Sequence, residues 1–431
     1  MTSAKAPIGS SSVDLLVTSA RVSDDRDLVD IAIAGERIVA IEPHIQADGV
    51  PTIDAAGRAV LPGFVEPHLH LDKALLYRRA PIRDGTLAEA LRVTAELKAE
   101  RNRDDVLERS RAVLDMAVAN GTTAIRAHPD LDPIQGLLGV ETGLALREQY
   151  RPLLDLQIVA FPQEGILRSP GTLELMEEAM RMGASVVGGC HYIERDWDDA
   201  RAHIDLVFEL AQRFGAPVDL HADFADHVTD PRYTAARYIA EKTIALGYQG
   251  RVSLGHATSL AALTPQEARP VVGLLSEAQV TVVALPSTDL YLGGRMDTYR
   301  QPRGVAPVRL LLEAGVNVTF SSNNVRNAFT PFGNADMLQI GSLLAHVAQL
   351  GTPADQAAVL RMATYAAARS IGLQDYGLGE GRIADLVVLD SPLIGDVLND
   401  IPARLWVLKR GRVTVRTEHR TVISRDASGA G

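Results

Sequence analysis

Two histidines separated by one residue, His68 and His70, end an apolar segment near the start of the chain, Gly-Phe-Val-Glu-Pro-His-Leu-His at 63–70. Side chains alternate between the two faces of a β-strand, so both imidazoles project to the same side. Neutral imidazoles side by side are ligands that suit zinc or iron. The pair therefore predicts a metal site at a strand end, and it favours a fold in which strand ends carry the chemistry.

The sequence after this pair alternates short apolar segments with amphipathic segments of helix length. Its 431 residues suffice for a large α/β barrel and an accessory module. Helices are expected at 86–101, 104–119, 171–182 and 206–214. Strands are expected at 63–70, 122–127, 154–161, 185–190, 217–221, 251–255, 280–285 and 316–321. Eight such strands predict an α/β fold of the (β/α)8 TIM-like barrel type.

Both ends of the chain have a different, β-rich pattern with short apolar runs and glycine turns. We expect the two ends to pair into one small β-sandwich module outside the barrel. The expected division is a disordered tail at 1–12, a β-sandwich module from 13–62 and 385–425, and a barrel at 63–384.

Charge and cysteine content exclude several classes of protein. A formal net charge of -11 disfavours nucleic acid or an anionic membrane as partner, since phosphate binding needs a cationic surface. The chain has no apolar run of 18 residues, so no membrane span is expected. The single cysteine, Cys190, excludes an internal disulfide framework and is consistent with a cytoplasmic location.

Two charged stretches are expected to be structural. The run 98–111 is interpreted as the solvated face of a helix and its linking turn. Asp72 and Lys73, which follow the histidine pair, are expected to form an ion pair.

Polar side chains stand at the ends of several predicted strands, where barrel enzymes place their chemistry. Four of the eleven histidines occupy the ends of three such strands, which indicates a cluster rather than isolated core residues. The strand-end residues are His68, His70, Gln163, His221, His256 and Asn323.

Longer motifs carry a resemblance to a known family over nearly the whole chain. They stand at 62–72 (Pro-Gly-Phe-Val-Glu-Pro-His-Leu-His-Leu-Asp), 156–166, 294–299 and 331–339 (Pro-Phe-Gly-Asn-Ala-Asp-Met-Leu-Gln). The chain resembles the amidohydrolase superfamily, specifically its branch of cytosine deaminases and N-isopropylammelide aminohydrolases. The resemblance implies hydrolysis of a carbon-nitrogen bond in a small nitrogen heterocycle, by deamination or by opening of a cyclic amide, in a homo-oligomer.

The resemblance also implies a ligand set of His68, His70 and His221, with Asn323 as a further ligand, for one divalent metal, zinc or iron. Three imidazoles leave an open position for water, whose pKa the cation would lower toward ~7. The predicted strand at 185–190 ends without the lysine that bridges two metals in some relatives, so one metal is expected.

Further roles follow from the same resemblance. His256 would polarise or orient the substrate, and Gln163 would read a ring amide edge with its donor and its acceptor. Phe329 would line the pocket. Arg326 departs from the family pattern, and two interpretations stay open: contact with an anionic or carbonyl-rich substrate, or a surface ion pair with a carboxylate.

Two positions depart from the family pattern. Phe224 stands where cytosine deaminases carry a proton-shuttling glutamate, and Asn323 stands where they carry a metal-binding aspartate. An amide oxygen can coordinate a cation but does not accept a proton at neutral pH.

Three hypotheses address the missing acids. Asp223, expected on the same strand face as His221, would act as general base, with Asp226 or His227 as substitutes. Alternatively, the substrate is activated and needs less proton transfer. In the third hypothesis, the chain binds a heterocycle without turnover or hydrolyses it without a metal.

Overall fold

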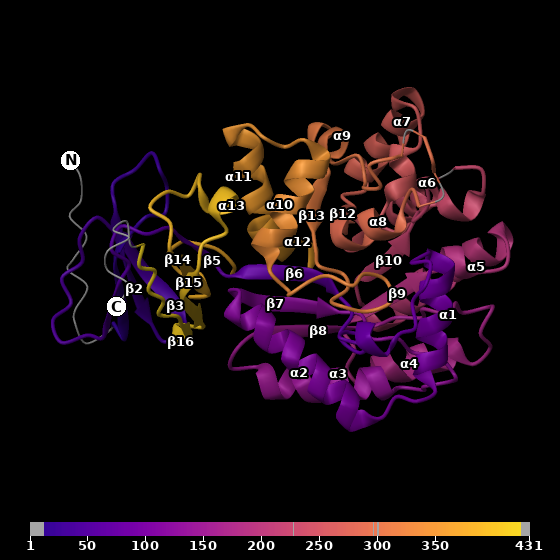
Figure 1. Ribbon diagram of the computed structural model, residues 1–431, viewed down its shortest axis with the longest axis horizontal. Coiled ribbons are helices and arrows are strands. Elements are labelled where there is room, and N and C mark those ends of the chain that lie inside the picture. The colour runs from indigo at the N-terminus through magenta and orange to yellow at the C-terminus, as the bar shows by residue number, and fades with distance from the viewer. Residues whose placement is uncertain (1–12, 227, 296, 300, 424–431) are drawn as a thin grey trace, which may run out of the picture.

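The computed structural model describes residues 13–226, 228–295, 297–299 and 301–423. The predicted tail at 1–12 lies outside these residues, as do the last two residues of the predicted module. A β module stands on one side of the molecule and a helix-covered barrel on the other (Figure 1).

The barrel is a single eight-stranded sheet in which each strand follows its predecessor in sequence order. Its strands are β6 (Phe64–Leu69), β7 (Thr122–Ala127), β8 (Asp155–Ala160), β9 (Val186–Cys190), β10 (Val218–Ala222), β11 (Val252–His256), β12 (Thr281–Ala284) and β13 (Asn317–Phe320). The N–H of His70 donates to the carbonyl of Asn323 at 2.9 Å, and the N–H of Asn323 donates to the carbonyl of His68 at 3.1 Å. These bonds join the first strand to the segment after the last, so the predicted (β/α)8 barrel is confirmed.

Burial explains why the strands read as nearly continuous apolar runs. Every residue of β6 and β10 is buried, as expected for parallel strands covered on both faces. On β10, Leu220 and Ala222 pack in the core with the helices, while Asp219 and His221 point into the barrel. A polar side chain that lies two residues before a strand-end histidine on the same strand therefore also points into the barrel.

Helices cover the outside of the barrel. They are α1 (Leu87–Lys98), α2 (Arg103–Ala119), α3 (Leu138–Tyr150), α4 (Thr172–Met182), α5 (Trp197–Phe214), α6 (Ala236–Ala245), α7 (Pro265–Glu277), α8 (Pro286–Leu292), α9 (Val308–Glu313), α10 (Met337–Ala348), α11 (Pro353–Arg361), α12 (Ala367–Ser370) and α13 (Val397–Asp400). α5 begins earlier than the predicted 206, because Asp196 accepts the N–H of Asp199 and caps the helix there. In the described residues no helix is both long and apolar enough to cross a membrane.

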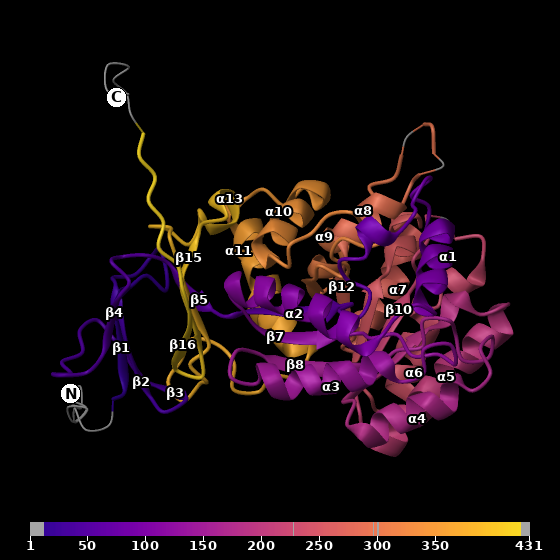
Figure 2. The same cartoon turned by 60° about the horizontal axis from the view of Figure 1, so that its bottom comes forward.

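The β module consists of two four-stranded sheets that face each other (Figure 2). One holds β1 (Leu15–Ala20), β2 (Val29–Ala34), β3 (Arg37–Glu42) and β4 (Thr52–Asp54); the other holds β5 (Val60–Pro62), β14 (Leu386–Leu389), β15 (Arg404–Lys409) and β16 (Arg412–Arg416). β5 pairs with β14, and Ile31 and Val60 share a core with Leu386 and Leu408. Both chain ends thus build the module, as predicted.

The charged run at 98–111 is only in part the solvated helical face and linking turn that the sequence suggested. Asp104 and Glu108 are exposed, but other members of the run are buried. Lys98 is buried at the end of α1, and its Nζ lies 3.2, 2.8 and 2.8 Å from carboxylate oxygens of Asp130, Asp132 and Glu164. A lysine becomes buried where enough carboxylates surround it, and these acids come from the loops after β7 and β8. This cluster fixes α1 at the end of the barrel away from the β module (Figures 1 and 2).

Asp72 and Lys73 likewise pair with other residues instead of each other. Asp72 accepts from Arg101 at 3.1 Å, and Lys73 donates to Asp130 at 2.9 Å. The expected ion pair between these two neighbours is wrong, because each charge has another partner. Asp72 also accepts the N–H of Asp130 at 3.2 Å, while Lys73 pairs with the carboxylate of that residue.

Candidate active site

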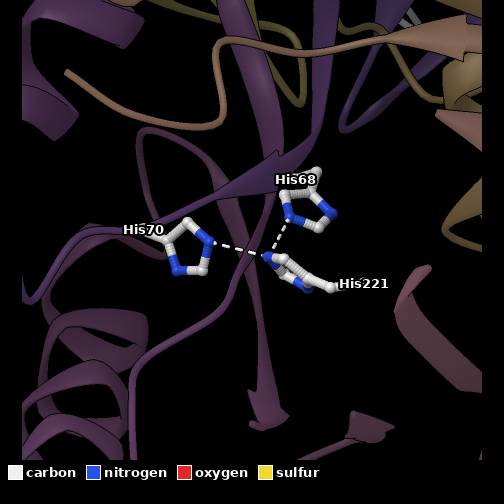
Figure 3. Close-up of side chains that lie close together, drawn as sticks. All are labelled: His68, His70 and His221. Carbon is white, nitrogen blue, oxygen red and sulfur yellow. Dashed lines mark hydrogen bonds between the residues drawn. The ribbon is translucent and has the colours of Figure 1, made fainter. Parts of the chain in front are cut away.

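Three imidazoles meet inside the mouth of the barrel (Figure 3). His68 lies at the end of β6, His70 directly follows that strand, and His221 lies on β10. The Nε2 atom of His221 is 3.1 Å from Nε2 of His68 and 3.0 Å from Nε2 of His70. The histidine pair is thereby joined by a residue 153 positions away from His68.

These imidazoles are neutral at physiological pH. Burial lowers the pKa of His68 to about 3 and holds the pKa of His70 and His221 well below the usual value. The Nδ1–H of His70 donates to the carbonyl oxygen of His128 at 2.7 Å, so Nε2 of His70 carries the lone pair. This nitrogen can therefore accept a hydrogen bond from His221 or bind a cation.

The group fits a tetrahedral metal ion. Nitrogens that bind one zinc at about 2.0–2.1 Å lie roughly 3.3 Å apart, which is close to the observed separations. The side-chain oxygen of Asn323 is buried at the same cavity and has no hydrogen-bond partner among the described residues. Two further groups could hold a metal, one around Asp219 and one around Asp130, but Arg126 and Lys73 already engage these carboxylates.

A buried carboxylate lies behind His68. The Oδ1 atom of Asp219 is 3.6 Å from Nδ1 of His68 and 3.1 Å from Nε2 of His128, and Arg126 donates to the other oxygen at 2.8 Å. Burial opposes ionisation, but His128 and Arg126 outweigh it and hold the pKa of Asp219 well below its usual range. A carboxylate behind a metal-binding imidazole orients the ring and raises its basicity.

Glu66 lies on the same strand face, two residues before His68. Its carboxylate accepts from the backbone N–H of Ser322 at 2.7 Å, from the Ser322 hydroxyl at 2.8 Å and from the Ser321 hydroxyl. Burial raises the pKa of Glu66 to about 7, although these bonds oppose the shift. Glu66 thus ties β6 to the chain after β13 directly beneath the histidines.

A second histidine and acid pair stands at the end of β11. The Nδ1 atom of His256 lies 2.6 Å from Oδ1 of Asp289 on α8, and the ring packs against Phe224 with the ring centres 4.4 Å apart. Burial raises the pKa of Asp289, and the contact with His256 opposes this rise. Because Nδ1 is engaged, Nε2 is the nitrogen that His256 offers to the cavity.

The cavity in front of the histidines is narrow. Leu87 and Leu91 of α1 cover it together with Phe224 and Phe329, and the space open to the centres of water-sized molecules is about 20 Å³. Among the described residues that line it, none is an aspartate or a glutamate. A wider groove of about 580 Å³ beside α7 and α9 contains none of these histidines.

Comparison with known proteins places this geometry in a family. The family model for the amidohydrolase family matches residues 51–415. The chain belongs to the amidohydrolase family. This confirms the assignment from the sequence motifs.

Two relatives of this amidohydrolase match along most of its length. N-isopropylammelide isopropyl amidohydrolase from Pseudomonas sp. is 31% identical over 415 residues, which cover 94% of this chain and 98% of the relative. Pterin deaminase from Rhizobium rhizogenes is 30% identical over 394 residues, which cover 90% and 88%.

A solved structure matches the fold closely. The crystal structure of 5-methylcytosine deaminase from Klebsiella pneumoniae, liganded with 5-fluorocytosine, superposes with a TM-score of 0.90 at 30% identity, over 95% of this chain and 99% of that chain.

Most predicted site residues of the amidohydrolase line one cavity. These are His70, His221, His256, Asn323, Gln163 and Phe329, and His68 contacts His221 directly behind them. Arg326 is instead exposed, donates to the carbonyl of Gly333 at 2.9 Å and is not among the described lining residues.

Asp223 is placed differently from the expectation. β10 ends at Ala222 and Asp223 adopts φ 53°, so it does not share the strand face of His221. Its two carboxylate oxygens accept the N–H groups of Ala235 and Ala236 at 2.8 and 3.0 Å, where α6 begins. This placement speaks against Asp223 as the general base.

The two substitutes for Asp223 gain no support either. The carboxylate of Asp226 accepts the N–H of Gly294 at 2.8 Å, and His227 lies outside the described residues.

Sequence reasoning missed four residues that lie beside the site. Glu66 and Asp219 each stand two positions before a predicted ligand, so strand alternation alone could have found them. His128 and Asp289 follow predicted strands at short distance. Lys73 was noticed, but its partners could not be foreseen.

Proposed function

We propose that this amidohydrolase hydrolyses a carbon-nitrogen bond of a small nitrogen heterocycle with one divalent metal, zinc or iron. One observation carries the proposal: the Nε2 atom of His221 lies 3.1 Å from that of His68 and 3.0 Å from that of His70, beside a narrow cavity. When bound there, the metal would supply a Lewis acid that activates water at neutral pH. The relatives are named for N-isopropylammelide, pterin and 5-methylcytosine, which are all nitrogen heterocycles.

His256 takes the proton-transfer role in this proposal. Asp289 holds Nδ1 of His256, so the imidazole has a fixed orientation and its Nε2 is available to accept or donate a proton in the cavity. The pair has the arrangement of a general base and the acid that orients it. No carboxylate among the described lining residues competes for this role.

The remaining cavity residues would bind the ring. Phe224 and Phe329 offer aromatic surface for a planar heterocycle, and Asn323 offers an unpartnered amide oxygen to the metal. Because the cavity has room for little more than one or two water molecules, binding of a heterocycle requires some of the residues that line it to move.

A second candidate function is binding of a heterocycle without turnover. The lack of acids among the described lining residues favours it, since the family's two acidic positions hold Phe224 and Asn323. In that case a ligand would bind and no product would accumulate.

We further propose that the protein is cytoplasmic, in line with its single buried cysteine. In line with the family, we propose that it is a homo-oligomer.

The first experiment is the metal content per chain, measured in protein purified without chelators and again after loading with zinc, iron or manganese salts. We expect about one ion per chain, lost in His221→Ala and retained in His44→Ala, a matched change at an exposed histidine. Metal-loaded protein is then screened for hydrolysis of aminated pyrimidines, triazines and cyclic amides. Protein that retains no ion under any loading condition would refute the proposed metal site.

A further inference from the structure

The amide of Gln163 does not have both of its hydrogen-bonding groups free. Nζ of Lys73 lies 2.8 Å from the side-chain oxygen of Gln163. An ammonium group only donates, so the Gln163 atom that faces it must be the oxygen. The amide nitrogen has the thiol sulfur of Cys190 at 3.9 Å as its neighbour, which is a weak acceptor. Gln163 therefore offers the cavity donors.

Lys73 adds positive charge to the same wall. Its ammonium donates to Asp130 at 2.9 Å and lies 5.2 Å from the ring centre of Phe329. Asp130 shares its charge with Lys98, at 3.2 Å from the other carboxylate oxygen. Lys98 has Asp132 and Glu164 as further partners, so the counter-charges of both lysines lie outside the described cavity lining. Among the described residues that line the cavity, Lys73 is the one charged side chain apart from the histidines.

A second amide on the cavity wall shows the same polarity. The oxygen of Asn324 accepts from Asn327 at 2.7 Å, and its nitrogen donates to the hydroxyl of Thr288 at 3.2 Å. The Asn324 oxygen is engaged, while its amide nitrogen has a second hydrogen to donate. Both amides therefore add donors to the wall around Lys73.

We propose that the substrate presents to Lys73 and Gln163 two neighbouring hydrogen-bond acceptors that share a negative charge. This inference rests on the proposed function and specifies its substrate class: an anionic, carbonyl-rich heterocycle, with either a deprotonated imide edge or a ring carboxylate. A cytosine-like edge would direct an amino group, which is a donor, at the donors of Lys73 and Gln163 and would leave buried groups unpaired, so it should bind more weakly.

Calorimetric titration of the full-length protein tests this, both as purified and after metal removal. The probes are barbiturate for the imide anion, orotate for the ring carboxylate, and uracil and cytosine as neutral rings. We expect at least one anion to bind ~10-fold or more tightly than both neutral rings. The two anionic probes distinguish the two sources of charge. Equal affinities, tighter binding of cytosine, or no binding by any probe would overturn the inference.

Two variants test whether Lys73 and Gln163 cause the preference for anions. Lys73→Met removes the charge and releases the oxygen of Gln163, so the preference for the anion should fall ~10-fold or more while relative affinity for cytosine rises. Gln163→Glu keeps the partner of Lys73, which protects folding, and should abolish anion binding by repulsion. Arg326→Met is the matched control, because this arginine lies outside the lining and its loss should leave the preference intact. An unchanged preference in Lys73→Met would refute the assignment.

Turnover separates this inference from the proposed function. Hydrolysis of neutral amino-substituted rings by metal-loaded protein, without any anion preference, would refute the substrate class and leave the hydrolase proposal standing. A preference for anions in a protein that retains no metal and forms no product would refute the hydrolase proposal and leave the substrate class standing.

Discussion

The two sides of the histidine cluster differ in charge. Behind the imidazoles lie three buried acids, with Asp219 beside His68, Asp289 beside His256 and Glu66 beneath them. In front, the described lining of the cavity contains no acid and one lysine. Asp219 and Asp289 thus lie beside histidine rings, while no acid lies on the described lining of the cavity. This difference underlies our proposals that proton transfer depends on a histidine and that the cavity favours anions.

The largest effect is expected where the two sides meet, at His256. His256→Gln removes the proposed proton-transfer group while the other three histidines stay in place, so kcat/KM should fall about 10²–10⁴-fold with metal content unchanged. The measurement is steady-state kinetics with metal analysis on the substrate that screening identifies. His346→Gln, a change at an exposed histidine, should have wild-type activity. Full activity of His256→Gln would remove the proton-transfer role.

The role of Glu66, behind the histidines, can be tested through the pH dependence of the free energy of unfolding. Its pKa of about 7 in the folded protein exceeds the ordinary 4.5, so folded Glu66 holds a proton that the unfolded chain releases between these values. The metal-free protein should therefore lose up to ~3 kcal/mol of stability as the pH rises from about 4.5 to about 7. Glu66→Gln should lack this part of the slope in urea unfolding across that range. Parallel pH profiles for the two proteins would show that Glu66 titrates normally.

Asp219 tests whether the acids behind the cluster act through the ligands. Asp219→Asn should lower metal affinity about 10–100-fold, because His68 loses the anion that orients it. Competition with a chelator gives the affinity. Asp155→Asn is the matched control. It also breaks a contact with a buried partner, Lys409 at 2.7 Å, but this partly buried carboxylate stands at the start of β8, outside the histidine cluster. Equal losses in both variants would mean that the effect is general destabilisation.

A change at Asn323, on the cavity side of the histidines, is expected to have the smallest effect. Asn323→Asp adds an acid to the cavity and should strengthen metal retention by roughly 10-fold, since a carboxylate is a better ligand than an amide. Asn317→Asp, at the opposite end of β13, should leave retention unchanged. Unchanged affinity in Asn323→Asp would count against Asn323 facing the cation.

Local periodicity accounts for what the sequence predicted well. His68 and His70 share a face because strand side chains alternate, and both therefore reach His221. The rule failed at Asp223, where the strand had already ended and a positive φ turns the side chain toward α6. A strand boundary that moves by one residue changes which face a side chain occupies.

The sequence by itself determined the barrel, the module from both chain ends and the histidines at the strand ends, because these depend on hydrophobic patterns within a few residues. Only the tertiary structure decided how each polar group is used. Lys73 meets Gln163 across 90 positions, and Lys98 meets Glu164 across 66. Such contacts fix which donors stay free and which charges are buried, and no local pattern encodes them. The location of the cavity could therefore be predicted from the sequence, whereas the hydrogen-bonding groups that it leaves free could be found only from the tertiary structure.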